Sequence, residues 1–229
     1  MMLGLGAAAV VLGGAAHGAF YRNSPLFGPT IHRLPTRDRV VALTFDDGPN
    51  PDATPLILDA LAARGAKATF FILGRHAERW PDLVARVAAD GHSIGNHGYF
   101  HRKLHFRSPA YVRHDLELGT ERIVNAGAPR PRLFRAPHGF RSPWVTHIAR
   151  TLGQRTVGWS LGVWDSDRPG VDQIARRTVD GAAPGSILLL HDGDGYNPAG
   201  DRLQTAHAVP LIVDELLGRG FRFALLDAA

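Results

Sequence analysis

The chain has 229 residues, of which 45% are hydrophobic and 21% are charged, which is enough for one substantial core and too little apolar material for several membrane spans. It contains no cysteine, which excludes disulfide frameworks, thiolate metal sites and cysteine nucleophiles. The formal net charge is +5, but basic and acidic residues are interleaved and no dense basic run contains aromatics, so a nucleic-acid-binding protein is disfavoured.

The N-terminal residues 1–20 are almost wholly alanine, glycine, valine and leucine, with no lysine or arginine before the apolar run. This composition predicts a membrane anchor or uncleaved signal in preference to a cleaved signal peptide, and either in preference to a soluble helix. Residues 21–38 contain three prolines and are expected as a linker or arm. Residues 39–229 are expected to form one globular domain.

From residue 39 onward, short apolar runs alternate with amphipathic stretches. The expected strands are residues 40–45, 68–73, 92–95, 133–135, 156–161, 186–190 and 221–226. The expected helices are residues 53–64, 81–89, 109–125, 143–152, 171–180 and 204–219, each ending near a glycine, including Gly181, that would adopt the left-handed conformation of a helix cap. This alternation predicts an α/β fold, a distorted barrel of about seven units, with a doubly wound sheet as the alternative.

In either architecture, reactive side chains gather at the carboxyl ends of the strands. The sequence agrees with this expectation, because reactive residue types follow five of the predicted strands. They are Asp46 and Asp47, His97 and His101, Arg135, Asp165 and Asp167, and His191 with Asp192.

Asp46 and Asp47 lie between an apolar strand and a Gly-Pro turn. Successive side chains leave a strand end in different directions, so the two carboxylates can serve a metal and a substrate separately. The alternative is that they only cap the turn.

His97 and His101 have the i, i+4 spacing with which two imidazoles bind one ion. With Asp47 on the same rim they would form a site of two histidines and one carboxylate, which suits zinc. Taken alone, the pair could equally be two structural histidines.

Two further segments carry chemistry. Arg135 begins a tight Arg-Ala-Pro-His-Gly loop, where it could keep a carboxylate ionised while a loop N–H faces an oxyanion; a structural ion pair is the alternative. His191 ends an apolar strand and suits a general acid, unless it only contacts a carbonyl group. Trp159, Trp164, Phe140 and Tyr196 lie near these motifs and could line a sugar groove or belong to the core.

The ordered set of motifs resembles the polysaccharide deacetylase family, also called NodB-homology or family 4 carbohydrate esterase domains. The motifs are TFDDGP at residues 44–49, HxxxH at 97–101, RxPxG at 135–139 and LLLHD at 188–192, and the resemblance covers roughly residues 39–226. It implies a distorted (β/α)7-type barrel that removes acetyl groups from sugars with a divalent metal, usually Zn²⁺.

The resemblance also implies a role for each motif residue. Asp47, His97 and His101 correspond to the metal ligands, Asp46 to the general base, Arg135 to its ionic partner and His191 to the general acid. The backbone N–H of His138 corresponds to the oxyanion donor, Asp165 to the aspartate that orients the acid, and Leu189 to the apolar residue beside the acetyl methyl, with Trp159 on the substrate side.

Four positions, in three of the motifs, depart from the family pattern. Gly98 stands where serine or threonine is usual, and His138 stands where an aromatic is common. In the fourth motif, Gly162 and Ser166 replace an aspartate and a tryptophan, so Asp167 competes with Asp165 as the partner of His191.

The expected function is therefore metal-dependent removal of acetyl groups from N-acetylated, or O-acetylated, sugars of a cell-envelope polysaccharide or glycoconjugate, by a membrane-anchored or exported protein. The expected partner is an acetylated glycan, with no nucleic acid, membrane association through residues 1–20, and the oligomeric state left open. The alternatives are hydrolysis of another C–N bond in a small amide, or non-catalytic glycan binding. Because Asp46 and His191 are both retained, catalysis is favoured, and the adjacency of Asp46 and Asp47 disfavours a glycosidase.

Overall fold

The computed structural model describes residues 13, 16–21 and 23–227. The strands are β1 (Val40–Asp46), β2 (Thr69–Ile72), β3 (Ser93–Asn96), β4 (Leu133–Phe134), β5 (Arg155–Thr156), β6 (Leu161–Gly162), β7 (Ile187–His191) and β8 (Arg222–Phe223). The α-helices are α2 (Ala53–Ala62), α3 (Gly74–Arg79), α4 (Pro81–Ala89), α5 (Pro109–Asn125), α6 (Pro143–Thr151), α7 (Val171–Gly181) and α8 (Leu203–Gly218).

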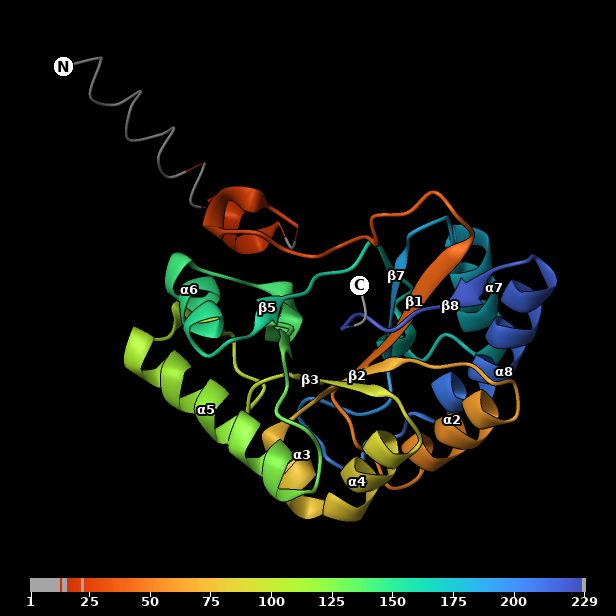
Figure 1. Cartoon of the computed structure of the whole chain (residues 1–229), viewed down its shortest axis with the longest axis horizontal. Helices are drawn as coiled ribbons and strands as arrows, with labels where there is room; N and C mark the ends of the chain where they lie inside the picture. Colours follow the sequence, from red (N-terminus) through yellow and green to blue (C-terminus); the bar gives the residue numbers. More distant parts are fainter. Residues whose placement is uncertain (1–12, 14–15, 22, 228–229) are drawn as a thin grey trace.

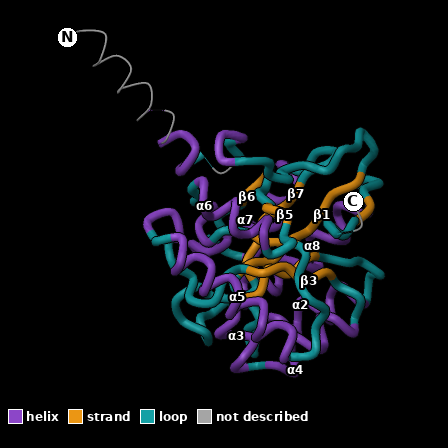
Figure 2. The backbone as a smooth tube through the Cα atoms, turned by 60° about the vertical axis from the view of Figure 1, so that its left-hand side comes forward, coloured by secondary structure: helices purple, strands orange, loops and turns teal. Residues whose placement is uncertain are grey.

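The strands pair in parallel in the order β5-β4-β3-β2-β1-β7-β6, with β8 pairing at the start of β1. The sheet is curled, and the helices run along its outer side (Figure 1), so that the strands lie at the centre of the molecule (Figure 2). The predicted distorted (β/α)7-type barrel is confirmed. Parallel strands connected through helices place every carboxyl end on one rim, which is where a site is expected.

Strand β1 shows how the sheet positions that site. Val41, Leu43 and Phe45 belong to the core cluster shared with the helices, whereas Ala42 packs in a separate cluster with residues of β2 and β7. Because side chains alternate along a strand, Thr44 and Asp46 share the face of Ala42 and point into the curled sheet. The register then places Asp46 beside His191 and Thr44 beside Leu189 of β7.

The prediction of one strand over residues 156–161 is wrong. The run begins on β4, where Val157 N–H donates to Phe134 O, and ends on β7, where Ser160 N–H donates to Ile187 O. It therefore crosses between the two edges of the sheet and contributes to two short strands, β5 and β6. The apolar run does contribute to the sheet, as predicted. Its two ends pair with different strands because β5 and β6 lie at opposite edges of the sheet.

The prediction for Gly181 is also wrong. It is the last residue of α7, and no left-handed conformation is recorded there, unlike at the other predicted helix-end glycines. A Cβ at Gly181 would lie 2.7 Å from a Leu161 methyl group, so a close approach between α7 and β6 explains the glycine. Helix α3 was not predicted, since its six residues are too few for a clear helical period.

Residues 24–38 run across the incomplete side of the barrel, from α6 to the start of β1 (Figure 1). Ile31 pairs with Val157, Arg33 pairs with Ser186, and Leu34 is buried. The buried Arg141 guanidinium donates to Ser24 O at 2.7 Å and to the Thr30 hydroxyl, which fastens the segment to the domain.

The predicted N-terminal anchor lies mostly outside the described residues. Within the part of the chain that the structure describes, no helix is long and apolar enough to cross a membrane.

Candidate active site and metal centre

A cavity of about 680 Å³ opens at the carboxyl ends of the strands. Its lining includes nearly all of the predicted site residues: Asp46, Asp47, His97, His101, His138, Trp159, Asp165, Leu189 and His191. Arg135 is the exception, because it is fully buried behind Asp46 and does not line the cavity. Segments separated by more than a hundred residues along the chain therefore meet in one place.

Asp47, His97 and His101 form a compact set of candidate metal ligands. One ligand atom from each residue lies within 4.8 Å of the others, and all three side chains are buried. Asp47 Oδ1 lies 3.3 Å from His97 Nε2 and 3.1 Å from His101 Nε2. Burial alone would raise the pKa of Asp47, but His101 and His97 hold it well below its ordinary value, so the carboxylate is charged.

The ring of His97 is oriented by a hydrogen bond to the backbone of Arg135. His97 Nδ1 donates to the carbonyl oxygen of Arg135 at 2.8 Å, which leaves Nε2 facing Asp47. Burial lowers the pKa of His101 to about 3, so its ring is neutral. The neutral ring of His101 has a nitrogen lone pair available for a metal ion, and its Nε2 lies beside Asp47 Oδ1, the oxygen with which it would share that ion.

Asp46 is held by a buried guanidinium. Its Oδ1 accepts a hydrogen bond from Arg135 Nη1 at 2.6 Å, and the same nitrogen lies 2.8 Å from the hydroxyl oxygen of Thr44. Arg135 Nη2 donates to Gly158 O at 2.9 Å. Asp46 therefore presents its second oxygen, Oδ2, to the cavity, 3.8 Å from His97 Nε2.

His191 is paired with Asp165. Its Nδ1 lies 2.9 Å from Asp165 Oδ1, its backbone N–H donates to Asp165 Oδ2 at 2.8 Å, and the Thr205 hydroxyl donates to the same oxygen. Burial would lower the pKa of His191, but the charge of Asp165 raises it to about 9. Asp167 is exposed, so of the two rival aspartates it is Asp165 that contacts His191.

A model of the polysaccharide deacetylase family matches residues 33–157, which is more than half of the chain. The chain belongs to the polysaccharide deacetylase family. It is 39% identical to a chitooligosaccharide deacetylase of Bradyrhizobium, over 80% of this chain and 87% of the relative. It is 38% identical to a peptidoglycan-N-acetylglucosamine deacetylase of Bacillus cereus, over 87% and 92% of the two chains.

The solved structures agree with the sequence relatives. The crystal structure of the peptidoglycan N-acetylglucosamine deacetylase Bc1960 superposes with a TM-score of 0.80 at 32% identity, and the match covers 87% of this chain and 91% of that one. The relatives at 38–39% identity are deacetylases, and this chain is an enzyme of the same type, as the motifs predicted.

In this deacetylase, the glycine at position 98 is explained by Asp115 of α5. Gly98 has a φ of +78°, and a Cβ there would collide with the Asp115 carboxylate. Asp115 is buried and accepts hydrogen bonds from the backbone N–H groups of Tyr99 and Phe100, at 3.1 and 3.2 Å. The carboxylate therefore holds the loop between the two histidines. Sequence reasoning missed Asp115, since a single aspartate in an amphipathic helix carries no local signal.

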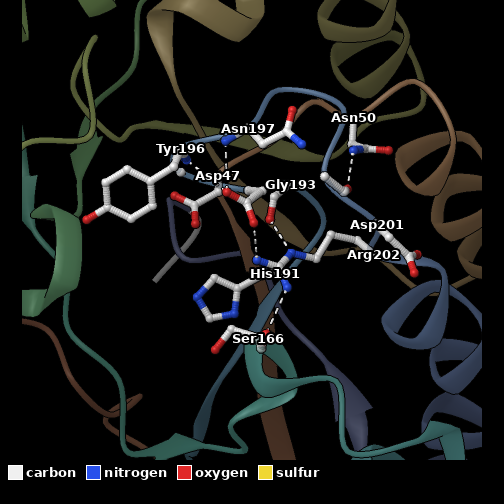
Figure 3. Close-up of polar contacts among 12 residues, drawn as sticks. Asp47, Asn50, Ser166, His191, Gly193, Tyr196, Asn197, Asp201 and Arg202 are labelled. Atoms are coloured by element: carbon white, nitrogen blue, oxygen red, sulfur yellow. Dashed lines mark hydrogen bonds and ion pairs between the residues drawn. The ribbon is translucent and has the colours of Figure 1, made fainter.

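Other residues of the deacetylase site were also missed. His76 of α3 is buried and uses Nδ1 to donate to the backbone carbonyl of Asp47 at 2.7 Å; burial lowers its pKa to about 4, so the ring is neutral. Arg202 donates to Gly193 O at 2.7 Å and to Ser166 O at 3.2 Å, which joins the β7–α8 loop to the segment after β6 (Figure 3).

Replacing Asp115 by alanine is expected to weaken metal binding. The change leaves two backbone N–H groups without their acceptor, at a cost of about 1–3 kcal/mol in the free energy of unfolding, and it frees the loop that carries His101. Loss of an outer contact of this kind lowers metal affinity by about 10–100-fold. Competitive chelator titration measures the affinity.

Glu117→Ala provides the matched control, because Glu117 is exposed on the same helix and its ion pair among the described residues is with the exposed Arg113. Equal metal affinity in the two variants would contradict the positioning role of Asp115.

Proposed function

We propose that the protein is a zinc-dependent deacetylase that removes acetyl groups from N-acetylated sugars of a cell-envelope glycan. The observation that carries the proposal is the register of β1 and β7, which sets Asp46 beside His191 at the rim where Asp47, His97 and His101 converge. A candidate base and a candidate acid therefore flank one set of metal ligands in one cavity.

The ligand set fits zinc. Asp47 Oδ1 is buried and has no conventional hydrogen-bond partner, although two imidazole nitrogens lie within 3.3 Å of it. Two imidazoles and one carboxylate leave coordination positions open for water and substrate, as in catalytic zinc sites. When bound, the ion supplies Lewis-acid polarisation of the acetyl carbonyl and lowers the pKa of water.

The proposed roles of the protein side chains follow from their contacts. Asp46, oriented by its hydrogen bond from Arg135, accepts the proton of the attacking water. His191, kept protonated by Asp165, donates a proton to the leaving nitrogen. An amide needs this second step more than an ester does, because an amine leaves poorly without a proton, so the pair favours N-deacetylation.

Three further residues shape the acetyl end of the cavity. The backbone N–H of His138 is proposed to donate to the developing oxyanion. Leu189 shares the cavity-facing side of β7 with His191 and, together with Trp159, is proposed to flank the acetyl methyl group. The names of the relatives, which refer to chitooligosaccharide and peptidoglycan substrates, support a glycan and action at the cell envelope.

The test is metal analysis of the purified protein followed by acetate release from chitin oligosaccharides, peptidoglycan and acetylated xylan. We expect one equivalent of zinc after reconstitution and acetate release from at least one N-acetylated glycan. No acetate from any of the three by the metal-loaded protein would contradict the proposal, and activity on a small cyclic amide would then identify a different C–N hydrolase.

Replacing Asp165 by asparagine is expected to move the alkaline limb of the pH–rate profile to lower pH. The acid form of His191 is the active form, so activity falls as the pH rises through its pKa. The charge of Asp165 raises that pKa, and removing the charge lowers it by roughly 1–3 units. The pH dependence of kcat measures the change.

Asp167→Asn is the matched control for this profile, because Asp167 is exposed two residues away. An alkaline limb that moves with Asp167→Asn, or stays in place with Asp165→Asn, would show that the pairing is assigned wrongly.

A further inference from the structure

A second cavity, of about 390 Å³, adjoins the active-site cavity. It is lined by His101, Arg102, Lys103, Phe106, Arg107 and Tyr196, and we refer to it as the cationic pocket. His101, Lys103 and Tyr196 line both cavities. A ligand bound at the candidate metal centre can therefore extend into the cationic pocket without leaving the protein surface.

The charges of this pocket are unbalanced. Arg102, Lys103 and Arg107 are exposed, and among the described residues no carboxylate forms an ion pair with any of them. Other surface arginines do have partners, such as Arg64 with Asp214. Three uncompensated cations around one concave surface create a local positive potential that attracts an anion.

The segment that carries the cations is anchored to the rest of the domain. The short helix η2 (Leu104–Phe106) begins three residues after His101, and its residues Leu104 and His105 are buried. The carbonyl oxygen of Arg107 accepts a hydrogen bond from Trp144 Nε1 at 2.9 Å, and its guanidinium lies 5.2 Å from the centre of the Tyr111 ring. The cations are therefore presented by an anchored segment, which reduces the entropy lost on binding.

Tyr196 forms the wall between the two cavities. Its hydroxyl lies 3.1 Å from His138 Nε2, and its ring packs edge-on against His101. Its ring projects away from the contacts that Arg202 makes in the same loop (Figure 3). Phe106, which also lines the cationic pocket, is 73% exposed and offers an apolar surface for a sugar ring.

We propose that the cationic pocket binds an anionic group of the glycan, a carboxylate or a phosphate, carried by the sugar next to the one that is deacetylated. Arginine recognises both groups through paired N–H donors, whereas a neutral glycan would leave the three charges unused. The inference rests on the proposed function and adds to it a preference among acetylated glycans.

The preference is measured with matched substrates of equal length. One arm compares an N-acetylglucosamine–N-acetylmuramic acid tetrasaccharide, which carries lactyl carboxylates, with its methyl ester. The other arm compares N-acetylchitotetraose with a phosphorylated form of it. We expect a higher kcat/KM for at least one anionic substrate than for its neutral counterpart, mostly through a lower KM, and a smaller ratio as salt rises.

The double variant Arg102→Gln/Arg107→Gln is expected to lower that anionic-to-neutral ratio by about fivefold or more, which is the effect of removing two partly exposed ion pairs. The charge-matched control is Arg132→Gln/Arg176→Gln, whose arginines are exposed outside both cavities. It should leave the ratio unchanged. Zinc content and circular dichroism of each variant establish that the site and fold persist.

Each outcome separates the two proposals. Deacetylation of all four substrates with a ratio near one, or an unchanged ratio in the double variant, overturns the cationic pocket alone. No deacetylation of any substrate overturns the proposed function itself. The arm that shows the higher ratio identifies the anion as carboxylate or phosphate.

Discussion

Replacing Asp46 by asparagine is expected to reduce acetate release by about 10²–10⁴-fold, the usual contribution of a positioned general base. Asparagine has nearly the same shape, and its amide oxygen can still accept a hydrogen bond from Arg135. It cannot take a proton from water. The proposed metal ligands Asp47, His97 and His101 remain, so the variant should bind zinc as the parent protein does. Acetate release and zinc content, measured on the same preparation, test the expected loss of activity and the expected retention of the metal.

Stability must be followed in this variant, because the Asp46–Arg135 ion pair is buried. Loss of the negative charge leaves the guanidinium uncompensated, which destabilises a protein by several kcal/mol when no other acceptor remains. Thr44 and Gly158 still contact Arg135, so we expect a lower melting temperature with retained folding. An Asp46→Asn protein that is folded, metal-loaded and nearly fully active would contradict the assignment of Asp46 as the base.

Replacing His97 by alanine is expected to remove both the metal and the activity. Both ring nitrogens of His97 have neighbours: Nε2 lies beside Asp47, and Nδ1 donates a hydrogen bond to the carbonyl oxygen of Arg135. Loss of an outer contact alone lowers metal affinity by about 10–100-fold, so loss of a ligand should cost more. Elemental analysis measures the zinc content, and acetate release should fall to the background.

Thermal unfolding with and without a chelator provides an independent readout. A ligand that binds only the folded state stabilises it, so the chelator should lower the melting temperature of the parent protein but not that of His97→Ala. His114→Ala is the control, because His114 is exposed on α5. Full zinc binding by His97→Ala, or a loss equal to that in His114→Ala, would show that His97 is not a ligand.

Local patterns in the sequence were sufficient for most of the architecture. Alternating apolar runs and helical periods predicted the parallel sheet and its covering helices, because burial on a sheet or helix face imposes a period on neighbouring residues. The same patterns predicted that reactive residues would follow the strands. Both expectations concern the relation of a residue to its near neighbours in the chain, which a single sequence records directly.

Only the tertiary structure shows which residues from distant segments of the chain contact one another. Sequence spacing left Asp165 and Asp167 as rivals, and the fold brought Asp165 to within 2.9 Å of His191. Asp115 and His76 support the loops that carry the proposed metal ligands, from helices whose sequences carry no sign of that contact. The division of residues 156–161 between two sheet edges was equally hidden.

For this protein, the sequence by itself determined the family, the barrel and the residue types at its rim. Only the tertiary structure decided which side chains touch, that Arg135 lies behind Asp46, and that the cations after His101 meet Tyr196 in one pocket. The physical reason is the distance along the chain over which each kind of interaction acts. Periodicity and turn chemistry act over a few residues, whereas hydrogen bonds and ion pairs depend on how close packing brings distant segments together.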